Sequence, residues 1–256
     1  MYGRIRVGRQ GFMGDLSITT FAESTQVAAA ADEIEKAVWS KMGFLNFSEP
    51  FVHYFDLMER YPDFQVAVVD RDRDYVVATG NLIPLYHDDP NDLPDGGWDW
   101  ALRRAWETID RKPNMVVGLS VSVPDAYRNR GLARLTLGAM RNLAESKDLG
   151  LPYLPVRPTM REHHLDMDIA DYAGWRRADG KLYDPWLRSH EGVGGRMLGI
   201  CRRSMVIEKP VGFWEAWSGQ AYDASGEYPI AGGCAPVVID LDKGIGTYVE
   251  PNVWYH

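Results

Sequence analysis

Residues 115–147 read MVVGLSVSVPDAYRNRGLARLTLGAMRNLAESK, and this stretch decides the fold. Its first part, Met115–Val123, is rich in Val and predicts a strand that ends at Pro124. Gly131–Lys147 then predicts a long helix with one apolar face. The residues of that face are Leu132, Leu135, Ala139 and Leu143. A strand, a short loop and a long helix in this order indicate an α/β architecture.

The loop between this strand and this helix has the composition of an anion-binding site. It ends in Arg128-Asn129-Arg130-Gly131-Leu132-Ala133, and Arg134 follows. The first N–H groups of a helix have no partner within the helix and lie at the positive end of its dipole. Gly131 puts no Cβ in the way of a phosphate, and the arginines add positive charge. We therefore expect phosphate binding here; the alternative is a plain connection with solvated arginines.

Helical and strand patterns alternate on both sides of this segment. Helices are predicted at Gln26–Trp39, from Ser48 to Tyr61, at Trp98–Asp110 and at Val211–Trp217, with partly helical segments at Asp168–Arg177 and Asp184–Leu198. Strands are predicted at Gln65–Val69, Tyr75–Ile83, Tyr153–Val156 and Ser204–Glu208, with a last hairpin within Pro236–Val249. The alternation predicts an α/β fold with a mixed central sheet flanked by helices.

Length and charge restrict the class of protein. The 256 residues are 45% hydrophobic and carry a net charge of −8, so we expect one folded domain over residues 1–256. The acidic excess opposes binding to nucleic acid. No apolar run reaches the roughly 18 residues of a membrane span. The start holds Arg4, Arg6 and Arg9 but no apolar signal region. We expect a cytoplasmic protein with neither nucleic acid nor membrane as a partner.

The strand, the loop pattern [Arg/Gln]-x-x-Gly-x-[Gly/Ala] and the helix resemble the acyl-coenzyme-A signature of the GNAT acyltransferase superfamily. The order of the elements agrees, and the helix at 98–110 looks like an insertion before the signature strand. The resemblance implies a coenzyme A thioester as cofactor, either acetyl-CoA or malonyl-CoA. Backbone amides would hold its pyrophosphate, and the strand would run along its pantetheine arm. The implied cofactor-binding residues are Leu119, Val121, Val123, Arg128, Asn129, Arg130, Gly131, Leu132, Ala133 and Arg134.

Three segments of the C-terminal half resemble the GNAT-like domains of polyketide-synthase loading modules. They are Val156–Thr159, Asp184–His190 and Tyr248–Trp254. In those domains the implied chemistry is decarboxylation of malonyl-CoA, with transfer of the acetyl group to the thiol of an acyl carrier protein. The resemblance implies that the catalytic residues are Thr159, His190 and Arg203, and that Trp39 lines the pocket.

These side chains suit that chemistry. Loss of CO₂ from a malonyl thioester leaves an enolate, so donors must face the thioester oxygen in a dry pocket. A Thr hydroxyl and a His ring can donate, and an Arg can bind the carboxylate. The same His can act as a base toward an amine. The alternative is that His190 is a structural residue of a helix and that Thr159 caps a turn.

Three functions stay open on the sequence alone. They are decarboxylative S-acetyl transfer, ordinary N-acetyl transfer to an amine, and acyl-CoA binding without catalysis. A metal site is not expected, because His163 and His164 are adjacent and point in different directions on a helix. Cys201 and Cys234 form no zinc motif and no Cys-centred nucleophile motif.

Overall fold

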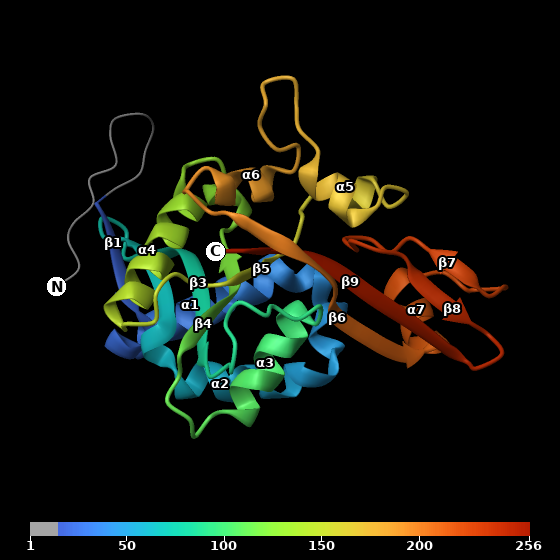
Figure 1. Cartoon of the computed structure of the whole chain (residues 1–256), viewed down its shortest axis with the longest axis horizontal. Helices are drawn as coiled ribbons and strands as arrows, with labels where there is room; N and C mark the ends of the chain where they lie inside the picture. The colour runs from blue at the N-terminus through green and yellow to red at the C-terminus, as the bar shows by residue number, and fades with distance from the viewer. Residues whose placement is uncertain (1–14) are drawn as a thin grey trace. The chain divides into compact units, whose positions relative to one another are not determined.

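The computed structural model describes residues 15–256, so Arg4, Arg6 and Arg9 lie outside the described residues. The chain divides into two compact units (Figure 1). Of the described residues, unit 1 contains 15–40, 55–88 and 105–153, whereas unit 2 contains 41–54, 89–104 and 154–256. The single domain expected from the sequence stays a prediction. Among residues 15–256, no helix combines the length and the apolar character that crossing a membrane requires.

Unit 1 is built on a four-stranded antiparallel sheet. Its strands, in order across the sheet, are β1 (Leu16–Thr20), β2 (Gln65–Asp70), β3 (Tyr75–Leu85) and β4 (Met115–Ser122). The predicted hairpin is β2–β3, in which Asp70 lies opposite Tyr75 across a charged turn. The predictions of this hairpin and of the signature strand β4 are confirmed, whereas β1 was not predicted.

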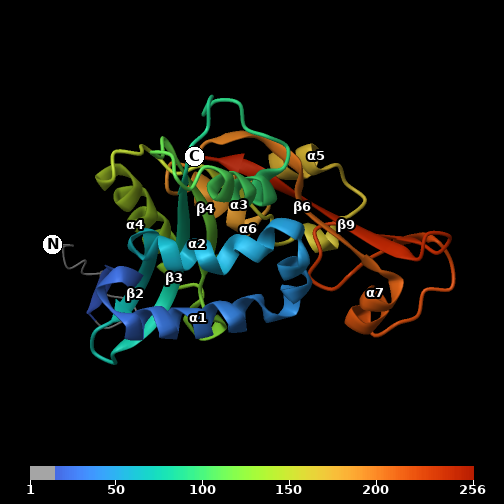
Figure 2. The same ribbon diagram turned by 90° about the horizontal axis from the view of Figure 1, so that it is seen from below.

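Two long helices cover opposite faces of this sheet. They are α1 (Thr25–Trp39) and α4 (Leu132–Ser146), and both match their predictions. On β3, the Thr79 hydroxyl donates to the Glu35 carboxylate of α1. A Cβ added at the next residue, Gly80, would lie 2.7 Å from Met140 Sδ of α4. Successive side chains of a strand point to opposite faces, so α1 and α4 pack on different faces of the sheet (Figure 2).

Two further predicted helices exist with shifted bounds. The helix expected after Ser48 begins as a 3₁₀ helix at Glu49–His53 and continues as α2 (Tyr54–Arg60). The helix expected before the signature strand is α3 (Gly97–Glu107). A helix therefore precedes β4 at the position where the sequence predicts an inserted helix.

Unit 2 holds a second antiparallel sheet. Its order is β5 (Leu154–Val156), β9 (Ile245–Tyr255), β8 (Val237–Asp240) and β7 (Gly226–Tyr228), and β6 (Met197–Pro210) also pairs with β9. Its helices are α5 (Ile169–Gly174), α6 (Pro185–Glu191) and α7 (Val211–Ser218). Tyr153 forms a parallel bridge with Val117 of β4, whereas Leu154–Val156 pairs with β9. The predicted α/β fold, with helices flanking its sheets, is confirmed.

The predicted helix over Asp184–Leu198 is wrong in its second half. The helix α6 ends at Glu191, and the strand β6 begins at Met197. The glycines between them break the helix, since Gly194 has a φ of +83°. The strand predicted at Ser204–Glu208 is thus only the middle of a much longer strand.

Candidate active site

The predicted cofactor loop lies in unit 1 between β4 and α4. Two of its residues adopt left-handed backbone conformations, Asn129 with a φ of +60° and Gly131 with a φ of +80°. Asn and Gly are the residues that adopt this conformation most readily. A Cβ at Gly131 would meet no described atom within 4 Å, so the requirement for Gly is conformational. Such a curled backbone turns successive N–H groups toward one concave side, where an anion can bind.

Four backbone N–H groups of this loop are available to a ligand. They belong to Asn129, Gly131, Leu132 and Ala133, and none of them donates a hydrogen bond within the described part of the chain. Two cationic side chains stay beside them: Arg128 forms an ion pair with Asp125 at 2.9 Å, and the Arg130 guanidinium lies 5.7 Å from the Tyr127 ring centroid. Helix-end amides together with exposed arginines form a site suited to a pyrophosphate.

The three residues predicted along the pantetheine arm, two in β4 and Val123 directly after it, are apolar and at least half-buried. Val121 lies opposite Gly80 of β3 in the sheet, and a Cβ added at Gly80 would contact side chains of α4. Val123 packs against a buried cluster that includes Leu132, and Leu119 is buried. Their contact with a cofactor stays a prediction.

The opposite face of β3 and β4 carries polar side chains that the sequence analysis missed. Ser120 donates to the Asn81 side-chain oxygen at 2.6 Å, and Trp39 Nε1 donates to the Ser122 hydroxyl at 2.9 Å. Thr79 and the half-buried Glu35 extend this polar face, with a hydrogen bond of 3.0 Å. The signal was present, because serine occupies every second position of the strand LSVSV.

The three C-terminal segments that resemble loading-module domains come together in unit 2. Arg157 Nε donates to both carboxylate oxygens of Glu250 at 3.0 Å, which joins the first segment to the third. Asp184 accepts the N–H of Met160 at 2.9 Å, which joins the second segment to the residue after Thr159. Asp184 also caps α6, because its other carboxylate oxygen accepts the N–H groups of the first helical turn. The hydrogen bonds of Asp184 therefore connect the turn that contains Thr159 with the helix that carries His190.

The three predicted catalytic residues differ in their surroundings. Thr159 is exposed in a turn, Arg203 is exposed on β6, and His190 is only 3% exposed on α6. Among the described residues, no hydrogen bond joins any two of them. Their catalytic roles stay predictions.

His190 lies in an apolar part of unit 2. Its ring centroid is 4.6 Å from that of Trp186 and 5.5 Å from that of Tyr255. Burial lowers the pKa of His190 to about 3, so the ring is neutral at pH 7. Its Nε2 atom has no hydrogen-bond partner among the described residues.

The histidine pair at 163–164 is divided between two environments. His163 is exposed beside Glu162, at 3.6 Å, whereas His164 contacts the ring of Trp175 edge-on and forms a hydrogen bond with Tyr183 Oη. Within residues 15–256, no three His, Cys, Asp or Glu side chains gather as metal ligands would. Cys201 and Cys234 are buried thiols, and burial raises the pKa of Cys201 to about 12.

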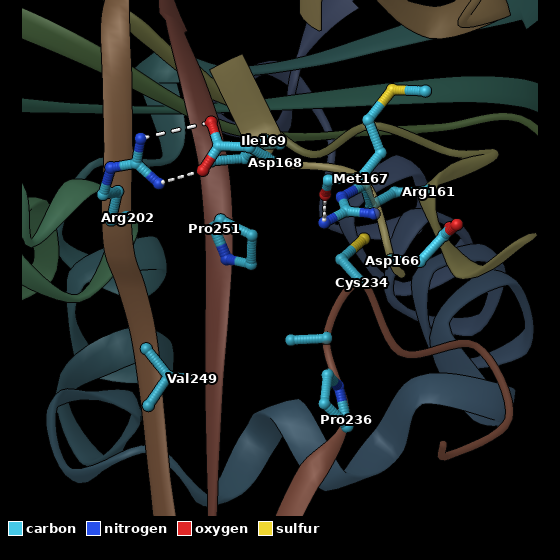
Figure 3. Close-up of a pocket in the computed structure, with 11 residues that line it drawn as sticks. Arg161, Asp166, Met167, Asp168, Ile169, Arg202, Cys234, Pro236, Val249 and Pro251 are labelled. Atoms are coloured by element: carbon cyan, nitrogen blue, oxygen red, sulfur yellow. Dashed lines mark hydrogen bonds and ion pairs between the residues drawn. The ribbon is translucent and has the colours of Figure 1, made fainter. Parts of the chain in front are cut away.

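Unit 2 also contains a pocket of about 440 Å³ (Figure 3). The segment from Arg161 to Ile169 forms one wall, Arg202 of β6 lies across from it, and Val249 and Pro251 come from β9. No local sequence pattern predicts this pocket, because its residues come from four separate parts of the chain.

Comparison with known proteins identifies the class. No protein-family model matches the chain. The chain is 34% identical over 220 residues to the arginine N-acetyltransferase avaD of Aspergillus versicolor, and the alignment covers 76% of each protein. Among solved structures, the loading GNATL domain of CurA from Lyngbya majuscula superposes with a TM-score of 0.54 at 16% identity, over 71% of this chain and 85% of that one. The GphF GNAT-like decarboxylase in complex with isobutyryl-CoA gives a TM-score of 0.47 at 16% identity, over 68% and 87%.

The fold and the sequence similarity define an acyltransferase of GNAT type. The chain belongs to the GNAT acyltransferase superfamily, and the predicted family and fold are confirmed.

Proposed function

We propose that this protein is an N-acetyltransferase that moves the acetyl group of acetyl-CoA to a nitrogen of a small molecule. The observation that carries the proposal is the 34% identity, over 76% of both chains, to a protein named as an arginine N-acetyltransferase. Arginine and related amines or guanidines are therefore the first acceptors to test. Neither a cytoplasmic location nor an acyl-carrier-protein partner is needed for this reaction, and both stay predictions.

The loop before α4 supports acetyl-CoA as the donor. The chain has a net charge of −8, so an anionic cofactor needs local attraction. The N–H groups of Asn129, Gly131 and Leu132 supply it at the helix end, and Arg128 and Arg130 add positive charge. We assign the pyrophosphate to these groups and the pantetheine arm to β4.

The transfer itself requires a base. The acceptor nitrogen attacks the thioester carbonyl, the C–S bond breaks, the thiolate of coenzyme A leaves, and the nitrogen loses a proton. The half-buried Glu35 is the carboxylate on the polar face of β3 and β4, and we assign the proton to it. His190 suits this role poorly, because its ring is only 3% exposed and packs against Trp186 and Tyr255.

Decarboxylation of malonyl-CoA with S-acetyl transfer to an acyl carrier protein is the second candidate. One observation favours it: the Arg157–Glu250 and Asp184–Met160 bonds hold together the three segments that resemble loading-module domains. Against it, Thr159, His190 and Arg203 form no hydrogen bond with one another in the described residues.

Mass spectrometry of reaction mixtures distinguishes the candidates. Incubation with acetyl-CoA and L-arginine, or a panel of small amines, should yield an acetylated acceptor and free coenzyme A. Malonyl-CoA incubated alone should stay intact. Conversion of malonyl-CoA to acetyl-CoA, with every amine left unmodified, would overturn the proposal in favour of the decarboxylase. Binding of both thioesters without turnover would instead identify a non-catalytic acyl-CoA-binding module.

A further inference from the structure

The pocket in unit 2 contains a buried cation whose donors are only partly used. Arg161 is 6% exposed, and its Nη2 donates to the Met167 carbonyl. Its Nε and Nη1 have no hydrogen-bond partner among the described residues, and it forms no ion pair with a described carboxylate. The centroid of the Tyr172 ring lies 5.5 Å from the guanidinium. Buried guanidinium donors are normally paired, so unpaired donors beside a cavity point to a missing anion.

The second arginine of the pocket is already neutralised. Arg202 lies on the other side of the pocket from Arg161 and pairs with Asp168 at 2.9 Å (Figure 3). This pair lowers the pKa of Asp168 to about 2, so it stays ionised. Arg161 is therefore the cation available to a ligand in this pocket.

A carboxylate lies on the same wall as Arg161. Asp166 is exposed, lines the pocket, and forms no hydrogen bond or ion pair within 4 Å with another described residue, although its charge acts on Arg161. It repels a doubly charged anion such as phosphate and attracts a cation. A ligand that satisfies both residues carries a carboxylate and, separately, a positive charge.

We propose that this pocket binds a basic amino acid, with its carboxylate held by Arg161 and its cationic group against Asp166. The volume of about 440 Å³ lies in the range of small-molecule sites and admits a molecule of this size. The choice of a basic amino acid rests on the proposed function, whereas the binding site rests on this pocket and is tested by binding alone, without acetyl transfer.

Calorimetric titration of the full chain without any thioester tests the proposal. The probes are L-arginine, agmatine, which lacks only the carboxylate, and inorganic phosphate. L-Arginine should bind, and agmatine should bind about tenfold more weakly or worse, since it loses the charge-assisted hydrogen bonds of Arg161. This comparison uses the unaltered protein and is independent of any folding defect. Equal affinity for the two ligands, tighter binding of phosphate, or no binding of L-arginine at millimolar concentration would overturn the proposal.

Two variants locate the site. Arg161→Met should reduce L-arginine affinity at least about tenfold, to the level of agmatine. Arg177→Met is the control, because Arg177 is exposed, its side chain pairs only with Asp179 among residues 15–256, and it does not line the pocket. Asp166→Asn, at an exposed side chain without a hydrogen bond to a described residue, should weaken L-arginine binding by about threefold to tenfold and change stability by less than about 1 kcal/mol. Unchanged binding in both pocket variants, with binding intact in the control, would place the ligand elsewhere.

Discussion

Arg157 shows what a single residue contributes to unit 2. Its guanidinium donates to Glu250, which is fully buried, and to the Gly232 carbonyl. Glu250 also accepts the Tyr248 hydroxyl at 2.7 Å, and that hydroxyl accepts the N–H of Cys234. Among the buried side-chain nitrogen and oxygen atoms of Arg157, Tyr248 and Glu250, none lacks a hydrogen-bond partner, so the loss of one member leaves a buried charge or acceptor less well paired.

We expect Arg157→Met to lower the free energy of unfolding by about 3–5 kcal/mol, because it leaves the buried Glu250 carboxylate without a counter-charge. Denaturant unfolding followed by tryptophan fluorescence measures this change. The control is Arg103→Met, which removes an exposed ion pair with Glu49 and should cost less than about 1 kcal/mol. Equal losses in the two variants would contradict the structural role of the network.

The buried ring of His190 predicts a pH dependence of stability. Its pKa is about 3 in the folded chain and about 6.5 when unfolded, so the unfolded state binds the proton more readily. The stabilisation from keeping His190 neutral is complete above pH 6.5 and is lost as the pH falls toward 3. Between pH 7 and pH 4.5, the unfolding free energy of the wild type should therefore fall by a few kcal/mol more than that of His190→Leu. Parallel pH profiles for the two proteins would show that the ring titrates normally.

Within the loop and helix α4, replacement of either of two glycines by alanine is expected to change stability, in opposite directions. Gly131 has a φ of +80°, whereas Gly138 lies inside α4, and a Cβ at either position meets no described atom within 4 Å. The difference between the two positions is thus one of backbone conformation alone.

We expect Gly131→Ala to destabilise the loop by about 1–2 kcal/mol and to weaken coenzyme A binding by about tenfold, because Ala disfavours the left-handed conformation. Gly138→Ala should raise stability by about 0.5–1 kcal/mol and leave the Kd for coenzyme A unchanged, because Ala is the better helix former. Thermal unfolding and calorimetry check both values. A Kd that changes equally in the two variants would mean that the loop conformation does not govern cofactor binding.

Elements with a contiguous local pattern were predictable from the sequence. The strand, loop and helix of residues 115–147 show hydrophobic periodicity and have Pro124 and Gly131 at their boundaries. The bounds of β4 and α4 agree with the predicted bounds within about a residue. The start of β6 was not predictable, because the residues after α6 keep an ambiguous pattern and become a strand only by pairing with β9. Strand β1 was missed for the same reason, since its place depends on pairing with β2.

At the scale of the whole molecule, the candidate sites differ in how far their residues are separated along the chain. The cofactor loop is one uninterrupted segment, and the sequence predicted it. The Glu35–Thr79 bond joins residues 44 positions apart, and the Arg157–Glu250 bond joins residues 93 positions apart. The Arg161 pocket draws on still more segments. Such sites are formed by contacts between residues that are far apart in the sequence, and a local sequence pattern does not predict these contacts.

A titration of the ¹⁵N-labelled protein with coenzyme A, followed through the backbone amide resonances, tests most directly whether the cofactor binds at this loop. We expect the largest shifts at Asn129, Gly131, Leu132 and Ala133, whose N–H groups are open to the pyrophosphate. Saturating shifts elsewhere in the chain, with these four amides unmoved, would contradict the assignment of the cofactor to this loop.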